Sequence, residues 1–268
     1  MAVLLLRETR DIDKVGGKAA RLGELLRLGI KVPDGFVITT DGTRTWSTGK
    51  HATVLEQFDK LGVRYVAVRS STVAEDGAEA AWAGQFDTFL FVDQKQLLDR
   101  IERCIASASS TRANAYGQAT GAAEKPEIAV IVQVMLPSEV SGVCFSVHPV
   151  TQDRNQMVIE AAYGLGEAVV SGEVTPDNYV VSRQSRAILS RTIAKQPKAL
   201  RFSEERGTTV WAKVGTPSAP KLSDAEILEL AAVAEQLEAS FGHPVDVEWA
   251  FYEHQLYILQ SRPITTLR

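Results

Sequence analysis

Apolar and polar residues follow two different periods along this chain, and the two periods alternate over its whole length. Short apolar runs predict strands at residues 35–40, 64–70 and 127–135. Apolar positions at helical spacing predict helices at residues 18–28, 49–62 and 94–116. The run EIAVIVQVM, residues 127–135, is continuously apolar, as expected for a strand that is buried on both faces. Alternating strands and helices predict an α/β or α+β fold.

A second series of elements follows Pro137, which ends the buried strand. The segments SGVCFSV, QMVIEAAY and TPDNYVVSR read as strands. Ser223 and Glu226 form a capping-box pattern, which predicts a helix that runs to Phe241 and ends at Gly242. We therefore expect two lobes, residues 1–132 and 137–268, joined by a linker at residues 133–136.

The last thirty residues predict a β-hairpin. Apolar residues at Val245, Val247, Trp249 and Phe251 alternate with Asp246, Glu248 and Ala250, and a second strand, LYILQSR, follows. A three-residue loop at residues 253–255 pairs Trp249 with Leu259, Phe251 with Tyr257, Glu248 with Gln260 and Asp246 with Arg262. A two-residue loop is expected to break this match, because a slip of one residue turns side chains to the other face.

The polar face of this hairpin has two interpretations. A carboxylate (Glu248) beside an amide oxygen (Gln260), with the guanidinium of Arg262 one pair further, can hold a hydrated magnesium ion and the phosphate that it bridges. The alternative is a solvated strand face with a surface pair between Asp246 and Arg262, and the spacing alone favours this alternative because exposed ion pairs are common.

Composition and charge narrow the class of protein. The chain has 268 residues, of which 45% are hydrophobic and 23% charged, as in ordinary globular proteins. A net charge of −4 gives no general attraction to nucleic acid or to an anionic membrane. The first residues, MAVLLLRETRD, hold too short an apolar run for a signal peptide or a membrane span, so a cytoplasmic protein is expected. Cys104 and Cys144 lack metal-ligand spacing, which predicts buried free thiols.

Several motifs occur together in a fixed order, and their combination resembles a known family. They are VGGKAARLGEL, VPDGFVIT, VAVRSSTVAED, WAGQFDTFL, SGVCFSVHP, GLGEAVVSG, TPDNYVV, and DVEWA followed by LQSRPIT. Together they resemble the ATP-binding domain of the phosphoenolpyruvate synthase and pyruvate phosphate dikinase family, which rifampin phosphotransferases share. The resemblance covers nearly the whole chain. It implies a two-lobed ATP-grasp fold, with magnesium ATP between the lobes.

The resemblance assigns phosphate-binding roles to residues of the first lobe. Lys18 is similar to the family's phosphate-binding lysine, and Arg69 to the arginine that holds the transferred phosphates. Taken alone, Lys18 also fits a surface lysine near a turn, and Arg69 a structural ion-pair partner. The segment with Gly84, Gln85 and Thr88 resembles a flexible phosphate cover, although its local sequence equally fits a plain hairpin turn.

The other assigned roles concern adenine, metal and the second lobe. Gln133, Met135 and Leu136 match the interlobe segment that meets adenine, and a buried strand end is the alternative. By the same resemblance, Glu248 and Gln260 are the magnesium ligands and Arg262 is the second phosphate-binding arginine. Glu160 and Glu167 are expected to complete the polar wall, while Glu167 also suits the start of a helix.

The chain departs from the family at its histidines. None of His51, His148, His243 and His254 stands in the family's TxH phosphohistidine motif. The resemblance therefore implies a phosphotransferase component whose phosphohistidine and acceptor domains lie on a separate or detached partner. Two other functions stay open: a nucleotide-binding module without turnover and, less supported by the motifs, an ATP-grasp ligase.

Overall fold

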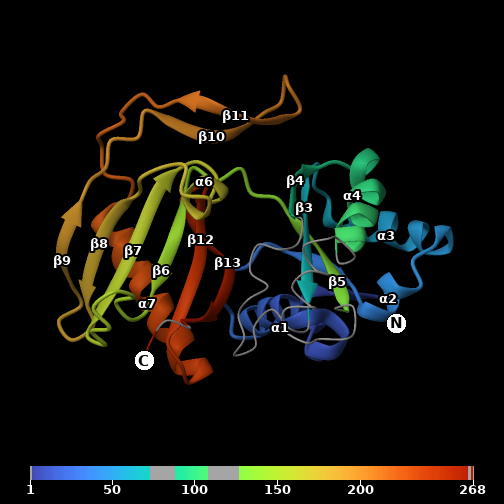
Figure 1. Ribbon diagram of the computed structural model, residues 1–268, viewed down its shortest axis with the longest axis horizontal. Coiled ribbons are helices and arrows are strands. Elements are labelled where there is room, and N and C mark those ends of the chain that lie inside the picture. The colour runs from blue at the N-terminus through green and yellow to red at the C-terminus, as the bar shows by residue number, and fades with distance from the viewer. Residues whose placement is uncertain (1, 73–87, 108–126, 265–266, 268) are drawn as a thin grey trace, which may run out of the picture. The chain divides into compact units, whose positions relative to one another are not determined.

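The computed structural model describes residues 2–72, 88–107, 127–264 and 267 of the chain. These residues form two compact units, Met1–Met135 and Leu136–Arg268 (Figure 1). Each unit contains its own β-sheet and its own helices. The division between the units falls inside the segment 133–136. The mixed α and β class predicted from the alternating periods is confirmed.

The first unit is built on a five-stranded antiparallel sheet with the order β1-β2-β5-β3-β4. Its strands are β1 (Val3–Leu5), β2 (Gly35–Ile38), β3 (Val66–Thr72), β4 (Thr88–Val92) and β5 (Ile128–Val134). Its helices are η1 (Leu6–Glu8), α1 (Ile12–Arg27), α2 (Thr40–Arg44), α3 (Thr48–Leu61) and α4 (Gln94–Ser107). Six of the seven residues of β5 are buried, as its continuous apolar run predicts.

Two helices of this unit differ from their predicted bounds. α1 begins at Ile12 instead of residue 18, because it joins two helical stretches across a kink at Gly16, where φ is +75°. The helical period in the sequence becomes regular only beyond that kink. α4 begins at Gln94 as predicted, and residues 108–116 of its predicted length lie outside the described residues.

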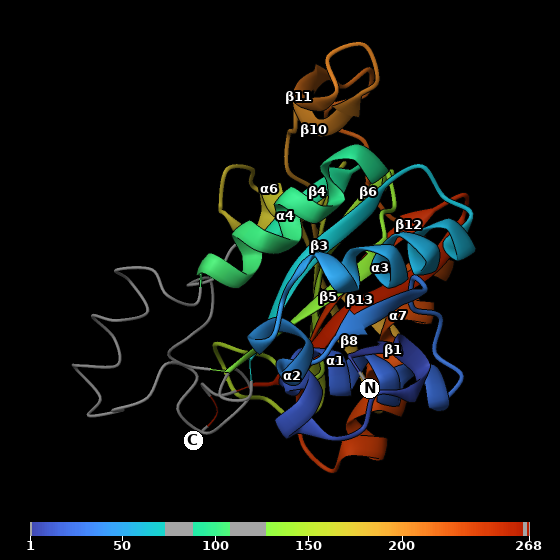
Figure 2. The same cartoon turned by 90° about the vertical axis from the view of Figure 1, so that its right-hand side faces the viewer.

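Alternate residues of the central strands determine which face of the first sheet meets which helix. Val66 and Val68 pack with residues of α3 and α4 in one buried cluster, and these two helices cover that face of the sheet (Figure 2). Ser71 points to the other face, since its Oγ accepts a hydrogen bond from the backbone N–H of Ala19 on α1 at 3.0 Å. Arg69, two residues earlier on β3, therefore lies on the α1 side of the sheet.

The second unit is built on a six-stranded antiparallel sheet with the order β13-β12-β6-β7-β8-β9. These strands are β6 (Val140–Phe145), β7 (Gln156–Tyr163), β8 (Asp177–Ser182), β9 (Ala187–Thr192), β12 (Val245–Tyr252) and β13 (Gln255–Pro263). A separate hairpin joins β10 (Lys198–Ser203) and β11 (Thr208–Lys213). The helices are α6 (Glu167–Val170) and α7 (Asp224–Phe241).

α7 has the bounds that its capping signals predict. Ser223 precedes it, and the carboxylate of Glu226 accepts a hydrogen bond from the Ser223 backbone N–H at 2.7 Å, while the Ser223 hydroxyl oxygen accepts one from the Glu226 N–H. Gly242 ends the helix with φ of +74°, a conformation that suits glycine. The predicted capping box and helix end are confirmed.

The position of α7 separates the two faces of the large sheet. Met157 on β7 and Val181 on β8 line one cavity together with Leu228 and Ala231 of α7, so this face of the sheet meets the helix. In the strand register, Met157 shares its face with Ile159, Cys144 and Val247. Residues between these positions, among them Glu160 and Glu248, lie on the face away from α7.

The β12–β13 hairpin has the predicted pairs at one end and different pairs at the other. Asp246 lies opposite Arg262 and Glu248 opposite Gln260, as predicted. The predicted pairs of Trp249 with Leu259 and of Phe251 with Tyr257 are wrong: Trp249 lies opposite Ile258, and Phe251 opposite Leu256.

The reason is a shorter turn combined with a β-bulge. Tyr252 pairs with Gln255, so the loop contains only Glu253 and His254, which have φ of +50° and +58°. The register then shifts between Glu248 and Trp249, where Leu259 is the extra residue. The two-residue loop breaks the predicted apolar pairs, as expected, whereas the bulge restores the two polar pairs beyond it.

Two further expectations concern the cysteines and the membrane. Cys104 and Cys144 are buried free thiols, as predicted. None of the helices in the described part of the chain is long and apolar enough to span a membrane.

Candidate functional site

Lys18 of the first unit lies immediately after the kink of α1. Its side-chain Nζ donates a hydrogen bond to the backbone carbonyl of Ser70 at 3.2 Å, and the residue is only 8% exposed. The kink at Gly16 allows α1 to approach β3 closely, because a Cβ atom at Gly16 would lie 2.4 Å from the carbonyl oxygen of Ser71. The alternative of a surface lysine near a turn is wrong, since the helix approaches the strand closely enough to bury the side chain.

Arg69 is the second basic residue of this region. Its Nη1 donates a hydrogen bond to Oε1 of Gln133 at 3.4 Å, and Nε2 of Gln133 donates to the carbonyl of Pro33 at 3.1 Å. Thr88, the first residue of β4, lies directly opposite Arg69 in the sheet and is exposed. The first unit thus brings Lys18, Arg69, Thr88 and Gln133 together around residues 69–71 of β3. The predicted cover residues Gly84 and Gln85 lie outside the described residues.

The predicted adenine segment lies at the end of β5. Gln133 is inside the sheet, between Gly35 on β2 and Ala67 on β3, and is 3% exposed. Its side chain supports Arg69 in this structure, a role that its place in the sequence does not reveal. Met135 donates its backbone N–H to the carbonyl of Tyr65 at 3.1 Å, and Leu136 begins the second unit.

In the second unit, polar side chains form a row across the face of the sheet that is turned away from α7. Gln260 on β13 lies opposite Glu248 on β12, which lies opposite Val143 on β6. Val143 lies opposite Glu160 on β7, and Glu160 opposite Asn178 on β8. One carboxylate and one amide oxygen therefore stand side by side at one end of the row, and a second carboxylate and amide stand at the other.

Arg262 is held beside this row by Asp246. The Nε and Nη2 atoms of Arg262 both lie 2.8 Å from Oδ2 of Asp246. Asp246 is 6% exposed, whereas the Arg262 side chain is 45% exposed. Burial raises the pKa of the Asp246 carboxyl, the guanidinium of Arg262 opposes that shift, and the charge of Glu248 adds to it. The alternative of a surface Asp to Arg pair is wrong for the carboxylate, because the sheet buries it.

Glu160 adds another carboxylate to the same face of the sheet. Burial and the charge of Asp246 raise the pKa of Glu160, while a hydrogen bond with Asn178 lowers it. Oδ1 of Asp246 is buried and has no hydrogen-bond partner within the described part of the chain. A cation over this face would lower the pKa of both carboxyl groups, because it favours the charged forms of Glu160 and Asp246.

The donor set limits the kind of metal site. Among the residues that the structure describes, no group of three or more histidine, cysteine, aspartate and glutamate side chains is arranged to hold a metal ion. Glu248 and Gln260, one carboxylate and one amide oxygen on paired strand positions, suit an ion that takes few protein ligands and keeps water and phosphate oxygens, which is the usual behaviour of magnesium.

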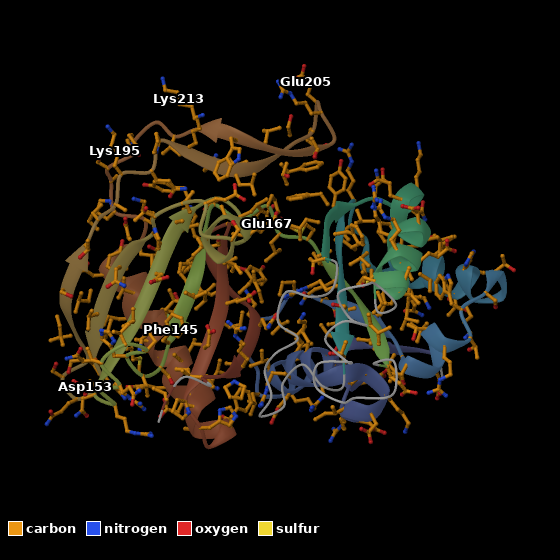
Figure 3. All side chains as sticks on the ribbon, in the orientation of Figure 1. Phe145, Asp153, Glu167, Lys195, Glu205 and Lys213 are labelled. Atoms are coloured by element: carbon orange, nitrogen blue, oxygen red, sulfur yellow. The ribbon has the colours of Figure 1, made fainter. Side chains whose placement is uncertain are left out.

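Glu167 reaches the neighbourhood of this face through the turn before α6. The hydroxyls of Ser138 and Ser141 both donate to the carbonyl of Gly164, at 3.0 and 2.6 Å. Gly164 has φ of +90°, and a Cβ there would lie 2.3 Å from the carbonyl oxygen of Leu200. Glu167 is the first residue of α6 and is exposed near the beginning of β6, far from Phe145 at that strand's end (Figure 3).

Sequence reasoning missed two contributors to the polar face. Asn178 contacts Glu160, and Asp246 fixes Arg262, yet neither was assigned to the site. Strand alternation in TPDNYVV is the signal for Asn178, because it places Asp177 and Asn178 on opposite faces. The strength of the Asp246 contact has no comparable signal, because burial depends on the neighbouring strands.

Comparison of the sequence with known proteins places the chain in a family. The family model described as pyruvate phosphate dikinase, AMP/ATP-binding domain, matches residues 12–61 and 50–268. A probable phosphoenolpyruvate synthase of Methanothermobacter thermautotrophicus is 38% identical over 96% of this chain and 45% of that protein. The rifampicin phosphotransferase of Bacillus cereus is 37% identical over 97% of this chain and 35% of that protein. The chain spans less than half the length of these relatives. The predicted resemblance is confirmed.

Solved structures give more distant matches. D-alanine–D-alanine ligase from Helicobacter pylori is 12% identical, with a TM-score of 0.46 over 96% of this chain and 56% of that chain. A dinucleotide-forming acetyl-coenzyme A synthetase from Ca. Korarchaeum cryptofilum is 9% identical, with a TM-score of 0.49 over 97% of this chain and 92% of that chain. Likeness at this level supports no statement about function.

Proposed function

We propose, on the premise that the chain belongs to the pyruvate phosphate dikinase AMP/ATP-binding domain family, that it binds magnesium ATP and supplies the phosphoryl group for transfer. The observation that carries this proposal is the pairing of Glu248 with Gln260 beside an arginine that a buried aspartate holds in place. Carboxylate, amide oxygen and guanidinium in that order suit a hydrated magnesium ion and a phosphate chain.

Each unit by itself carries residues that suit magnesium ATP. In the first unit, Lys18 and Arg69 supply positive charge for the phosphate oxygens, and the hydroxyl of Thr88 lies on the strand next to Arg69. In the second unit, Glu248 and Gln260 would hold the metal, and Arg262 would bind phosphate. A bound magnesium ion supplies charge neutralisation of the phosphates. Phosphoryl transfer depends mainly on such positioning and charge stabilisation.

The phosphoryl acceptor in this proposal is a histidine outside the 268 residues. The chain's own histidines include His148, whose Nδ1 accepts hydrogen bonds from the backbone N–H groups of Val150 and Thr151 at 3.3 and 3.2 Å. Another, His254, is in the two-residue turn between β12 and β13. Neither position is on the polar row of the sheet.

The first prediction concerns magnesium-dependent binding of ATP. Isothermal titration calorimetry is expected to show that the chain binds ATP with magnesium and binds it much more weakly with EDTA. Glu248→Ala is expected to weaken this binding by about 100-fold, since it removes the charged ligand of a hard cation and leaves the phosphate charge uncompensated. Gln260→Ala is expected to have a smaller effect, because it removes a neutral ligand.

The matched control is Glu229→Ala, which removes an exposed carboxylate from α7 on the opposite side of the same sheet. It is expected to leave ATP affinity unchanged. Lys18→Met keeps most of the buried side-chain volume and removes the charge, so it separates phosphate binding from packing. If the wild-type chain binds no adenine nucleotide, the proposed function is refuted. If Glu248→Ala and Glu229→Ala lose ATP affinity equally, Glu248 is not part of the site.

The second prediction concerns the covalent carrier. Incubation of the chain alone with magnesium ATP, labelled separately at the β and γ phosphates, is expected to give no stable phosphohistidine, because the proposal assigns the nucleophile for that step to another domain. Addition of a histidine domain from a relative is expected to give label on that domain and release of AMP or ADP. Stoichiometric acid-labile, base-stable label on this chain would contradict the division of roles, and mass spectrometry would locate the modified histidine.

A further inference from the structure

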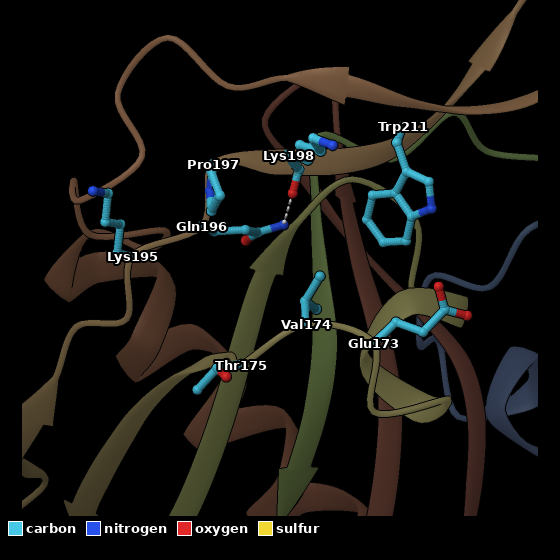
Figure 4. A pocket seen from close by; sticks show the side chains of 8 residues that line it. All are labelled: Glu173, Val174, Thr175, Lys195, Gln196, Pro197, Lys198 and Trp211. Carbon is cyan, nitrogen blue, oxygen red and sulfur yellow. Dashed lines mark hydrogen bonds between the residues drawn. The ribbon is translucent and has the colours of Figure 1, made fainter.

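A cavity of about 500 Å³ lies in the second unit, beside the β10–β11 hairpin. Its walls are residues 173–175, which follow α6, and residues 195–198, which lead into β10. Trp211 of β11 forms the third side (Figure 4). None of the residues proposed above to bind ATP or magnesium lines it. A volume of this size is typical of pockets that hold a small organic molecule.

Hydrogen bonds hold the walls of this cavity in place. Gln196 is 2% exposed, and its Nε2 donates to the carbonyls of Tyr163 at 2.9 Å and Lys198 at 3.1 Å. Oε1 of Gln196 accepts from the backbone N–H of Tyr163 at 2.8 Å. Leu200 of β10 accepts from the N–H of Leu165 at 3.0 Å, which fastens the hairpin to the turn before α6. The cavity is therefore part of the packed unit and is formed before any ligand arrives.

Trp211 presents an apolar ring to this cavity. The hairpin register places Trp211 opposite Leu200, and the indole is directed toward the space above Val174, with the carboxylate of Glu173 beside it (Figure 4). Trp211 is 41% exposed, whereas the other tryptophan of this unit, Trp249, is completely buried. An accessible indole with a preformed cavity beside it favours a flat apolar ligand, which would remove the ring from water and stack on it.

The charges around the cavity favour an anion. Lys195 and Lys198 line it, and neither forms an ion pair with any of the residues that the structure places. Glu173 is the single acidic residue of the lining, and its carboxylate already accepts a hydrogen bond from the hydroxyl of Ser171 at 3.3 Å. Two lysines against one glutamate leave a net positive lining.

From the cavity, the exposed indole and the net positive lining, we propose that this pocket binds a small planar aromatic anion, with its ring on Trp211 and its acidic group toward Lys198. The pocket constitutes a second ligand site of the chain, separate from the proposed ATP site. It stands on its own geometry and does not require that the chain transfer phosphate.

The test uses 2-naphthoate, a two-ring aromatic carboxylate, titrated into the full chain in the presence of saturating magnesium ATP. The ¹H–¹⁵N resonance of the Trp211 indole N–H reports occupancy, and calorimetry reports affinity. The neutral analogue 2-naphthalenemethanol and the non-aromatic anion cyclohexanecarboxylate test the charge and the ring separately. We expect 2-naphthoate to bind more tightly than either analogue, by about threefold or more, which is the range of one exposed charge contact or one aromatic contact.

Three variants make the test specific. Trp211→Ala is expected to weaken 2-naphthoate binding by about tenfold, and Lys198→Ala by about threefold. Lys213→Ala is the matched control, because Lys213 is exposed on the same hairpin, directly opposite Lys198, but does not line the cavity. It is expected to leave the affinity unchanged.

Several outcomes would overturn the proposal. Absence of 2-naphthoate binding would do so, as would equal binding of the neutral analogue, or an unchanged affinity in Trp211→Ala. Binding of 2-naphthoate without magnesium ATP but not with it would show that the pocket belongs to the nucleotide site. These results differ from a failure of the proposed function, in which the chain does not bind ATP but the indole of Trp211 still responds to 2-naphthoate.

Discussion

Replacing Trp249 by alanine is expected to lower the free energy of unfolding of the second unit by about 3–5 kcal/mol. The indole is completely buried, and its ring lies edge to face with Phe251 at a centroid distance of 5.7 Å. Its Nε1 has no hydrogen-bond partner within the described residues, so the loss comes from apolar burial and from the cavity left behind.

Trp211→Ala is the matched control for this prediction, because the same side chain is 41% exposed there. We expect that change to cost less than about 1 kcal/mol, as for most surface substitutions. Urea denaturation followed by circular dichroism measures both, since loss of a tryptophan does not remove that signal. Trp249→Phe fills much of the site and provides a second measurement if the alanine variant does not fold. Equal losses at the two positions would contradict the burial argument.

Trp249 also shows where sequence reasoning succeeds and where it stops. Strand alternation predicts that Trp249 points away from Glu248, and this is confirmed by the sheet. Its cross-strand partner was wrong, because alternation does not reveal a bulge. The helix that follows Ser223 was predicted to the residue, because both of its ends depend on local signals.

Other parts of the candidate site depend on contacts that are distant in the sequence. Position 16 requires glycine because the backbone there lies against Ser71. Gln133 supports Arg69 through one hydrogen bond and is itself held by another to the carbonyl of Pro33. Strands β9, β10 and β11 were not predicted, because almost none of their residues is buried and the strands lack a buried apolar face. The motifs therefore identify the residues of the proposed site, while the packing that supports them comes only from the fold.

The buried ion pair between Asp177 and Lys221 is an example of such packing. Both side chains are completely buried, and Nζ of Lys221 lies 2.7 Å from Oδ1 of Asp177. The carboxylate also accepts hydrogen bonds from the backbone N–H groups of Ala194 and Lys221 and from the hydroxyl of Tyr179, at 2.8, 3.0 and 2.7 Å. Asp177 thus joins the beginning of β8, next to Asn178 of the polar row, to the segment that leads into α7.

Asp177→Ala is accordingly expected to destabilise the second unit by about 3–5 kcal/mol, because it leaves the ammonium group of Lys221 buried without its counter-charge. The measurement is urea denaturation by circular dichroism. Glu56→Ala is the matched control: it removes a pair with Lys60 at the same 2.7 Å distance, but with side chains 64% and 59% exposed. That change is expected to leave the free energy of unfolding nearly unchanged, because an exposed ion pair contributes little.

The double variant Asp177→Leu with Lys221→Met separates charge from packing. It removes both charges and keeps apolar volume, so it is expected to recover a large part of the stability lost in Asp177→Ala. If Asp177→Ala destabilises no more than Glu56→Ala, water reaches Lys221 and the pair is not part of the core. If the double variant is as unstable as Asp177→Ala, the hydrogen bonds that Asp177 accepts from Ala194 and Tyr179 hold this part of the unit together, and the charge of Lys221 contributes little.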